Sequence, residues 1–274
     1  MNLLVKLIGM FLIAQLLGIY AGSYIIEDAK NNEVVSYMLI ENSGPETIPW
    51  FVFAVLFGAG IFLVLARLKI PFLFTLLEIA VISATSSILF YSFIKPVLGL
   101  TIESMAAAIL LAFVLAVAKQ FFPNLKNAAA LLSSAGAGAV FGFTFGFLAA
   151  MLFLLVLAIY DYISVYKTKH MVTMATEIVK RNMAFTITAK EKLPSGKESR
   201  LDLGTGDLSI PIMAEVSAYS ISPLLSGWAL AGALAGVGIV LFTAWKRKQI
   251  LPALPPIALG IILFTLFALL TGLY

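Results

Sequence analysis

The sequence contains no cysteine and only one histidine among its 274 residues, and this scarcity excludes several types of functional site. Without cysteine the chain has no disulfides, no thiolate nucleophile and no cysteine-ligated metal. The single histidine, His170, follows the basic stretch Lys167-Thr168-Lys169, so we interpret it as a solvated loop residue rather than a metal ligand. We therefore expect neither a metal nor a cofactor.

Charged residues are also scarce, at 12%, whereas hydrophobic residues make up 61% of the chain. This composition lies far from that of an average soluble domain and is typical of membrane proteins. The net charge of +4 is modest and comes from loop lysines and arginines, so it gives no sign of nucleic-acid binding. We expect the lipid bilayer to surround the chain and predict a multi-pass protein of the cell membrane.

Long apolar runs predict nine transmembrane helices, because a helix needs about 20 apolar residues to cross a bilayer. The predicted spans are 3–24, 49–67, 71–93, 100–119, 125–143, 146–166, 207–223, 226–245 and 252–272. Two pairs of spans are divided inside nearly uncharged stretches, at Gly142–Gly146 and Ser222–Gly227, where glycine or proline favours a turn. The first run, Asn2–Tyr20, resembles a signal peptide, but its length is more typical of a first span.

The positions of lysine and arginine predict the orientation, since these residues are enriched in cytoplasmic loops. An N-terminus in the cytoplasm places nearly all of them on that side and leaves only Lys30 and Lys95 outside. The predicted fold is an all-α polytopic membrane protein with its N-terminus cytoplasmic and its C-terminus outside. It is a single membrane domain over 1–274, with six helices in 1–166, a cytoplasmic loop in 167–203 and three helices in 204–274.

The cytoplasmic loop contains a pattern that predicts a short β-hairpin before the seventh helix. Residues 183–189 are rich in β-branched and aromatic side chains, and Leu193–Gly196 is a turn signal. An isolated hairpin is only marginally stable, so a disordered linker is an equally good interpretation of the same segment.

Two aspartates lie where a membrane protein rarely tolerates them. Asp161 ends a long uncharged stretch, and Asp207 begins a later apolar one. A carboxylate inside a membrane is energetically costly, which makes each a candidate functional residue. A single loop connects their helices, so the two side chains can meet. Two carboxyls that share one proton supply a general base and a general acid together, and such a pair can activate water to hydrolyse peptides.

Glycine and proline surround these acids. Gly204 and Gly206 allow the backbone to approach a substrate closely beside Asp207. The segment Leu251–Pro256 contains three prolines, which disfavour helix and leave extended backbone near the acids. Structural interpretations compete with these: prolines are frequent at helix starts, and Asp207, unlike Asp161, suits an acid that caps a helix N-terminus.

Three motifs occur in order on the sixth, seventh and ninth predicted spans: Tyr160-Asp161, Gly204-Thr205-Gly206-Asp207 and Pro252-Ala253-Leu254. They resemble the YD, GxGD and PAL motifs of the presenilin and signal peptide peptidase family of intramembrane aspartyl proteases, and the resemblance covers essentially the whole chain. It implies that Asp161 and Asp207 are the catalytic pair and that transmembrane helices of other proteins are the substrates. It also implies that the other motif residues position substrate: Tyr160, Gly204, Gly206, Pro252, Ala253 and Leu254.

The chain lacks the long hydrophilic extension and large loop of animal presenilins, so it resembles a compact prokaryotic homologue of archaeal type. The predicted N-terminus in the cytoplasm matches presenilin more than the inverted signal peptide peptidase. Thr205 stands where many members of the family carry leucine, which bears on substrate preference and not on the catalytic acid. A homo-oligomer is compatible with the sequence.

A proton-coupled transporter or channel is the alternative function, because paired acids and interrupted spans also suit that class. Transport does not require Pro-Ala-Leu beside Gly-x-Gly-Asp, so the order of the three motifs favours the protease. Two further acids lie inside predicted spans. We interpret Glu78 as structural and leave the role of Glu215 open.

Overall fold

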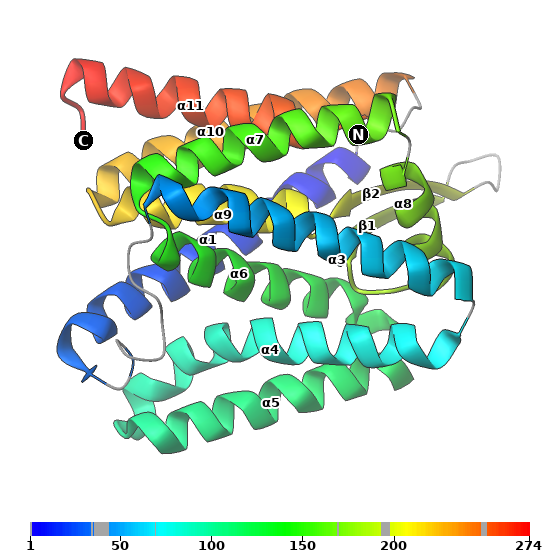
Figure 1. Ribbon diagram of the computed structural model, residues 1–274, viewed down its shortest axis with the longest axis horizontal. Helices are drawn as coiled ribbons and strands as arrows, with labels where there is room; N and C mark the ends of the chain where they lie inside the picture. The colour runs from blue at the N-terminus through cyan, green and yellow to red at the C-terminus, as the bar shows by residue number, and fades with distance from the viewer. Residues whose placement is uncertain are drawn as a thin grey trace.

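The computed structural model describes residues 2–33, 35, 44–68, 70–168, 170–192, 198–247 and 251–274. Within these ranges Figure 1 shows a bundle of long helices with a small two-stranded sheet at one end. The helices are α1 (Asn2–Asn31), α3 (Ile48–Leu68), α4 (Pro71–Leu98), α5 (Thr101–Phe121), α6 (Lys126–Thr144), α7 (Phe147–Tyr166), α8 (His170–Lys180), α9 (Gly206–Tyr219), α10 (Pro223–Arg247) and α11 (Leu254–Thr271). Short 3-10 turns, η1 (Pro45–Thr47) and η2 (Pro123–Leu125), precede α3 and α6, and strands β1 (Thr186–Lys192) and β2 (Glu198–Gly204) precede α9.

Seven of the described helices are long and apolar enough to cross a membrane: α1, α3, α4, α5, α7, α10 and α11. The chain is therefore a multi-pass membrane protein. Helices α6 and α9 also lie in predicted spans, but they differ from these seven helices in length or in composition. α9 has only 14 residues, about 21 Å at 1.5 Å per residue, and α6 is rich in alanine, glycine and serine rather than in large apolar side chains.

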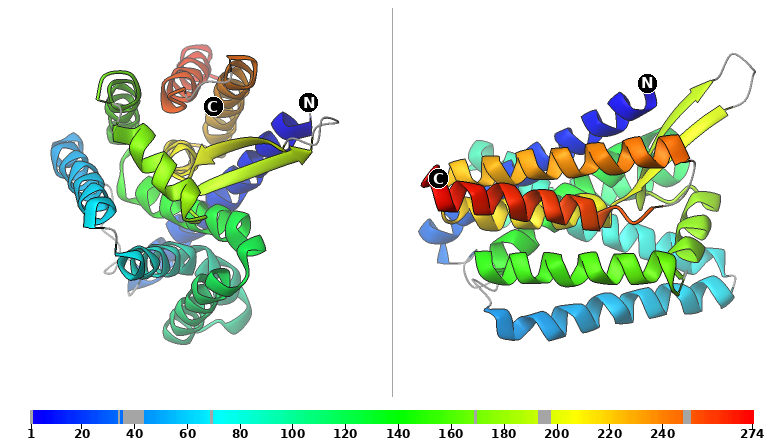
Figure 2. Two further views of the ribbon diagram at one scale, coloured as in Figure 1. Left: turned by 90° about the vertical axis from the view of Figure 1, so that its right-hand side faces the viewer. Right: turned by 90° about the horizontal axis from the view of Figure 1, so that it is seen from above.

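Helix α9 lies at the centre of the bundle, in contact with α1, α6, α7 and α10 (yellow in the left view of Figure 2). A Cβ added to Gly138 or Gly142 of α6 would lie 2.5 Å from the side chain of Ile212 or Val216. Such close approach depends on small residues, because lipid supplies no hydrophobic force to drive helices together. Enclosure by protein explains why α9 needs neither the length nor the hydropathy of a lipid-facing helix.

Helix α3 lies at the edge of the bundle (Figure 2) and is the least buried of the seven membrane-crossing candidates. Its side chains Trp50, Phe53 and Phe57 are each more than half exposed. The contacts of α3 with other helices are made mainly with α7 and α8. Most of its surface therefore suits contact with lipid.

The segment between α7 and β1 contains a helix, α8, where we predicted only a hairpin or a linker. Its side chains Met174 and Ile178 pack against a small apolar cluster formed by Phe62 of α3, Phe74 of α4 and Met183. Glu177 pairs with Lys180 at 3.2 Å, and this hydrogen bond is the main cause that holds the pKa of the Glu177 carboxyl below its usual range. The hydrophobic-run criterion missed α8 because it is short and one face is polar.

Strands β1 and β2 pair antiparallel, from Thr186 opposite Gly204 to Lys192 opposite Glu198. The predicted turn, Leu193–Gly196, lies outside the described residues. Ile187 and Leu203 are buried in the main core, and β1 packs against α1 and α6. A two-stranded ribbon is marginal alone, so this packing is what stabilises the sheet.

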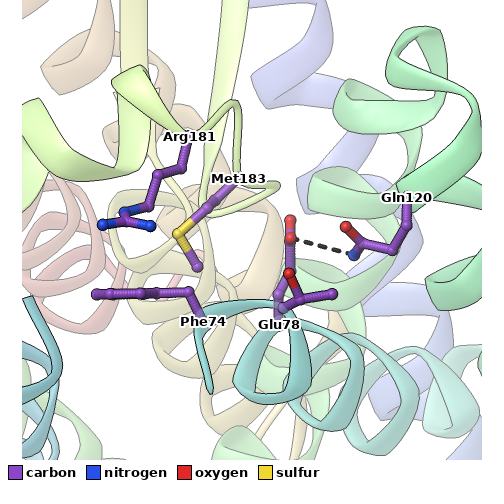
Figure 3. Close-up of a pocket in the computed structure, with 6 residues that line it drawn as sticks. Phe74, Glu78, Gln120, Arg181 and Met183 are labelled. Carbon is purple, nitrogen blue, oxygen red and sulfur yellow. Dashed lines mark hydrogen bonds between the residues drawn. The ribbon is translucent and has the colours of Figure 1, made fainter. Parts of the chain in front are cut away.

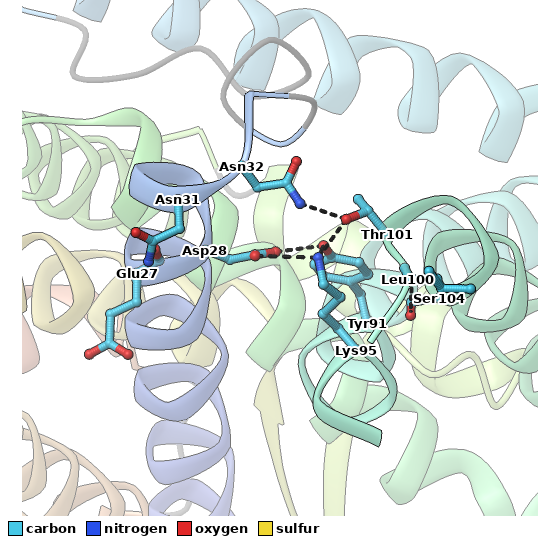
Figure 4. A network of polar contacts seen from close by, with 9 residues as sticks. All are labelled: Glu27, Asp28, Asn31, Asn32, Tyr91, Lys95, Leu100, Thr101 and Ser104. Carbon is cyan, nitrogen blue, oxygen red and sulfur yellow. Dashed lines mark hydrogen bonds and ion pairs between the residues drawn. The ribbon is translucent and has the colours of Figure 1, made fainter. Parts of the chain in front are cut away.

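A polar network ties the end of α1 to α4 and α5 (Figure 4), and these helices meet at the end of the bundle opposite the strands (Figure 1). Asp28 accepts hydrogen bonds from the Tyr91 hydroxyl at 2.6 Å and from Lys95 Nζ at 3.4 Å. Lys95 also donates to Thr101 Oγ1 at 2.5 Å. Both charged side chains are only 11% exposed, so removal of either would leave the other buried without its partner.

Candidate active site

Asp161 lies in α7, five residues before the end of that helix, and is only 5% exposed. Its Oδ2 accepts the backbone N–H of Leu254 at 3.1 Å, and the backbone of Ala253 also hydrogen-bonds to the carboxyl. Leu254 is the first residue of α11, and Ala253 is its N-cap. The Pro-Ala-Leu segment therefore reaches Asp161 through main-chain donors, at a helix N-terminus that favours negative charge.

Asp207 is the second residue of α9 and is partly buried. The backbone of Gly204 hydrogen-bonds to its carboxyl, and a Cβ added to Gly204 would lie 3.1 Å from Asp207 Oδ2. Glycine thus allows the end of β2 to approach the acid closely. Gly206, by contrast, is exposed and has open space beside it, because an added Cβ there would meet nothing within 4 Å.

The two carboxyls come together because α7 packs against α9. Asp207 lies close enough to interact with the charge of Asp161. Tyr160, the residue before Asp161, is partly buried and also interacts with that charge. All three motifs therefore meet at one place, although Leu254 lies 93 residues from Asp161 in sequence.

The start of α9 is held against the start of β1. The backbone N–H of Thr205 donates to the carbonyl of Phe185 at 3.0 Å, and Thr205 Oγ1 donates to the same oxygen at 3.3 Å. Ser209 Oγ in turn donates to the Thr205 carbonyl at 2.9 Å. Residue 205, which the motif comparison linked only to substrate preference, therefore also anchors the helix that carries Asp207.

Asn127 of α6 covers one edge of the sheet, a role that the sequence did not suggest. Its Nδ2 donates to the Thr188 carbonyl at 2.9 Å, and its Oδ1 accepts the Thr188 N–H at 2.9 Å. Thr188 therefore directs its main-chain groups away from β2. In an antiparallel sheet, residue pairs that hydrogen-bond to each other alternate with pairs that do not. Thr188 and its partner Asp202 form a pair that does not, so the main-chain groups of Asp202 point away from β1. The same holds two residues away on either side, for Arg200 and Gly204.

The two additional acids have different surroundings. Glu78 is buried and ion-paired with Lys119. Glu215 is fully buried in α9, and neither of its carboxyl oxygens has a hydrogen-bond partner among the described residues. Across those same residues no three acidic or histidine side chains gather into a metal-binding group.

The chain matches a family model described as signal-peptide peptidase, presenilin aspartyl protease, over residues 8–272. Two solved structures of a presenilin family intramembrane aspartate protease, in space groups C222 and P2, each align with a TM-score of 0.67 and 23% identity. They cover 96% and 94% of this chain, and 96% of each solved chain is covered. At that identity they show the shared fold. A search of curated protein sequences gave no significant match.

The family match covers nearly the whole chain, and it favours proteolysis over the transporter alternative. Members of this family act on transmembrane substrates within the membrane. The chain belongs to the signal-peptide peptidase and presenilin family and is an intramembrane aspartyl protease.

Proposed function

We propose that Asp161 and Asp207 are the catalytic pair that hydrolyses peptide bonds inside transmembrane segments. The observation that supports this proposal is that the two carboxyls, on the packed helices α7 and α9, lie close enough for their charges to interact, each with backbone donors. One proton shared by the pair makes one carboxyl a base and the other an acid. No nucleophilic side chain is needed, because water is the nucleophile.

The hydrogen-bond donors divide the roles between the two acids. Asp161 receives main-chain donors from both Ala253 and Leu254, whereas Asp207 receives one, from Gly204. Donors favour the ionised form of a carboxyl, so we assign the base to Asp161. It takes a proton from the attacking water, while Asp207 protonates the peptide carbonyl oxygen. The tetrahedral diol then collapses: its nitrogen takes the proton from Asp161, one of its hydroxyls returns a proton to Asp207, and the C–N bond breaks to leave a carboxylic acid and an amine.

The other motif residues position substrate beside this pair. Gly206 leaves open space next to Asp207, which a peptide backbone can enter. Pro252 has no N–H, so Ala253 and Leu254 carry the main-chain donors of their segment. Tyr160 and Gly204 flank the two acids directly.

We also propose that nine of the described helices, all except the short α8, span the membrane, as a single domain over 1–274 with the N-terminus in the cytoplasm. Helices α6 and α9 fall short of the hydropathy or length of the other seven, but protein rather than lipid surrounds α9. This topology puts the 167–203 segment and both acids toward the cytoplasmic side of the cell membrane, which the distribution of lysine and arginine favours. The pair lies within one chain, so catalysis does not require a homo-oligomer.

The substrate must unwind before hydrolysis, because the carbonyl of a helical peptide bond is hydrogen-bonded and shielded. We propose that the unwound segment adds as a strand to the outer edge of β2. The edge of β1 is occupied at Thr188 by Asn127, whereas Arg200 and Asp202 direct their main-chain groups away from β1. The same edge continues to Gly204, which hydrogen-bonds to Asp207, so a strand in this register leads to the catalytic pair.

Cleavage of a membrane-embedded peptide by the purified protein tests the catalytic assignment. We expect Asp161→Asn and Asp207→Asn each to abolish cleavage and to keep the thermal stability of the wild type, since an amide cannot share the proton. Glu215→Gln is the matched control, because it removes a carboxyl from the same helix as Asp207 and should retain activity. Substantial activity in either Asn variant would refute the assignment.

Paired substitutions test the strand-addition proposal. Asp202→Ala removes a side chain, and Asp202→Pro removes in addition the outward N–H without breaking a bond to β1. We expect the proline variant to cleave a Gly-containing transmembrane substrate markedly more slowly than the alanine variant does. Equal rates for the two variants, or equal cleavage of a stiff Leu-rich substrate and one that carries Gly or Pro near the site, would contradict the proposal.

A further inference from the structure

Glu78 is a buried carboxylate of α4 that is far from Asp207 in sequence but linked to it by a short series of hydrogen bonds. We propose that Glu78 is a positioning residue for Asp207, acting through the segment Ala184-Phe185 and through Thr205. This inference deepens the proposed function and rests on it.

Glu78 is 3% exposed and accepts hydrogen bonds from three donors. Lys119 and Gln120, at the end of α5, donate to its two oxygens, the second at 3.1 Å. The backbone N–H of Ala184 donates to Glu78 Oε1 at 2.5 Å. One carboxylate therefore joins α4, α5 and the turn that leads into β1, over a sequence separation of 106 residues.

Hydrogen bonds rather than close packing hold this carboxylate in place. A pocket of about 240 Å³ borders Glu78 and is lined by Phe74, Thr75, Gln120, Arg181 and Met183. Figure 3 shows Glu78 between Gln120 on one side and Met183 on the other. With open volume beside it, loss of a donor or of the charge would let the side chain and the Ala184 turn move.

The segment Ala184-Phe185 is hydrogen-bonded to the start of α9. Ala184 is followed by Phe185, whose carbonyl accepts both the N–H and the hydroxyl of Thr205. Thr205 is the N-cap of α9, and Asp207 lies in the first turn of that helix. Asp161 is held separately, by Leu254, so a displacement of the start of α9 would change the separation of the two catalytic carboxyls.

Asp28 provides a matched control within the same chain. It is a carboxylate of similar burial that also pairs with a lysine, Lys95, and with a second helix. Its network (Figure 4) joins the end of α1 to α4 and α5, at the end of the bundle opposite the strands (Figure 1). If Glu78 supports catalysis only by stabilising the fold, substitution of Asp28 should lower activity as much as substitution of Glu78 does.

The test compares Glu78→Gln with Asp28→Asn in the purified full-length chain. We expect both substitutions to lower thermal stability. Only Glu78→Gln should lower kcat, by about tenfold or more, with KM changed less than about twofold and with an altered pH profile. Hydrogen exchange should also become faster in peptides that cover residues 184–207 in Glu78→Gln, but not in Asp28→Asn.

A double-mutant cycle with Thr205→Val tests the series of bonds. Thr205→Val removes one of the two donors to the Phe185 carbonyl, so the loss of kcat in the double variant should be smaller than the product of the two single losses. Effects that multiply would contradict a shared link. An unchanged kcat and pH profile in folded Glu78→Gln, or an equal loss of kcat in Asp28→Asn, would overturn the proposal.

Two further measurements cover the cases in which Glu78→Gln does not fold or the proposed catalytic pair is wrong. If Glu78→Gln does not fold, Glu78→Asp keeps the charge near Lys119 but withdraws it from Ala184 by one methylene, and a wild-type kcat in that variant would overturn the proposal. Substantial cleavage by Asp161→Asn or Asp207→Asn would instead refute the proposed catalytic pair. The hydrogen-exchange comparison would then still decide whether Glu78 holds Thr205.

Discussion

Replacement of Leu254 by proline removes a main-chain hydrogen bond from the active site together with a buried apolar side chain. The Leu254 N–H donates to Asp161 Oδ2 at 3.1 Å. Leu254 is the first residue of α11, where proline is well tolerated because that N–H has no partner within the helix. Ala253 has φ −88° and ψ −35°, a conformation that a following proline disfavours, so some loss of stability is expected.

The expected loss of activity follows from the burial of this bond. A hydrogen bond to a charged group contributes about 1.5–3 kcal/mol, and about 1.4 kcal/mol corresponds to a factor of ten in rate. Loss of the donor should therefore lower kcat/KM by roughly one to two orders of magnitude. Ala253 also donates to Asp161, which favours the lower end of this range. The acidic limb of the pH profile should move to higher pH, because the ionised carboxyl loses a donor.

The assay is cleavage of a fluorogenic transmembrane peptide over a range of pH, together with thermal unfolding of each variant. Leu254→Ala is the matched control, since it removes the side chain and keeps the N–H. We expect Leu254→Ala to retain most of the activity and the wild-type pH profile. A folded Leu254→Pro variant with wild-type kcat/KM, or an equal loss in Leu254→Ala, would refute the reasoning.

Three further outcomes are expected. The rate of cleavage should depend on pH as a bell, because the pair works only while it holds one proton and both limbs report the pair rather than a single acid; a flat profile in single-turnover assays would contradict this. Gly206→Val should fold like the wild type but lower kcat/KM by roughly ten- to a hundredfold, because its side chain fills the space beside Asp207; wild-type cleavage would show that substrate does not pass there. Gly232→Ala should lower the free energy of unfolding by about 1–3 kcal/mol, because its Cβ would lie 2.3 Å from the Gly260 carbonyl, whereas Gly227→Ala in the same helix meets nothing within 4 Å and should be tolerated in thermal unfolding.

The sequence by itself determined the membrane class, the approximate ranges of the long helices and the two candidate acids. Apolar runs are informative here because a segment that crosses lipid must satisfy its backbone hydrogen bonds internally, as a helix does. Each long run of apolar residues therefore marks one transmembrane helix. Asp161 and Asp207 could be identified for the same reason, since charge in such runs is rare. Both signals are local along the chain.

Only the tertiary structure decided which groups meet. Leu254 reaches Asp161 across 93 residues and Ala184 reaches Glu78 across 106, and no local pattern of residues encodes such pairs. The donors in both contacts are main-chain N–H groups, which every residue except proline carries and which no motif can mark. The position of α9 and the helical state of 170–180 also depended on neighbours, because other helices enclose α9 and α8 packs one apolar face against α3 and α4.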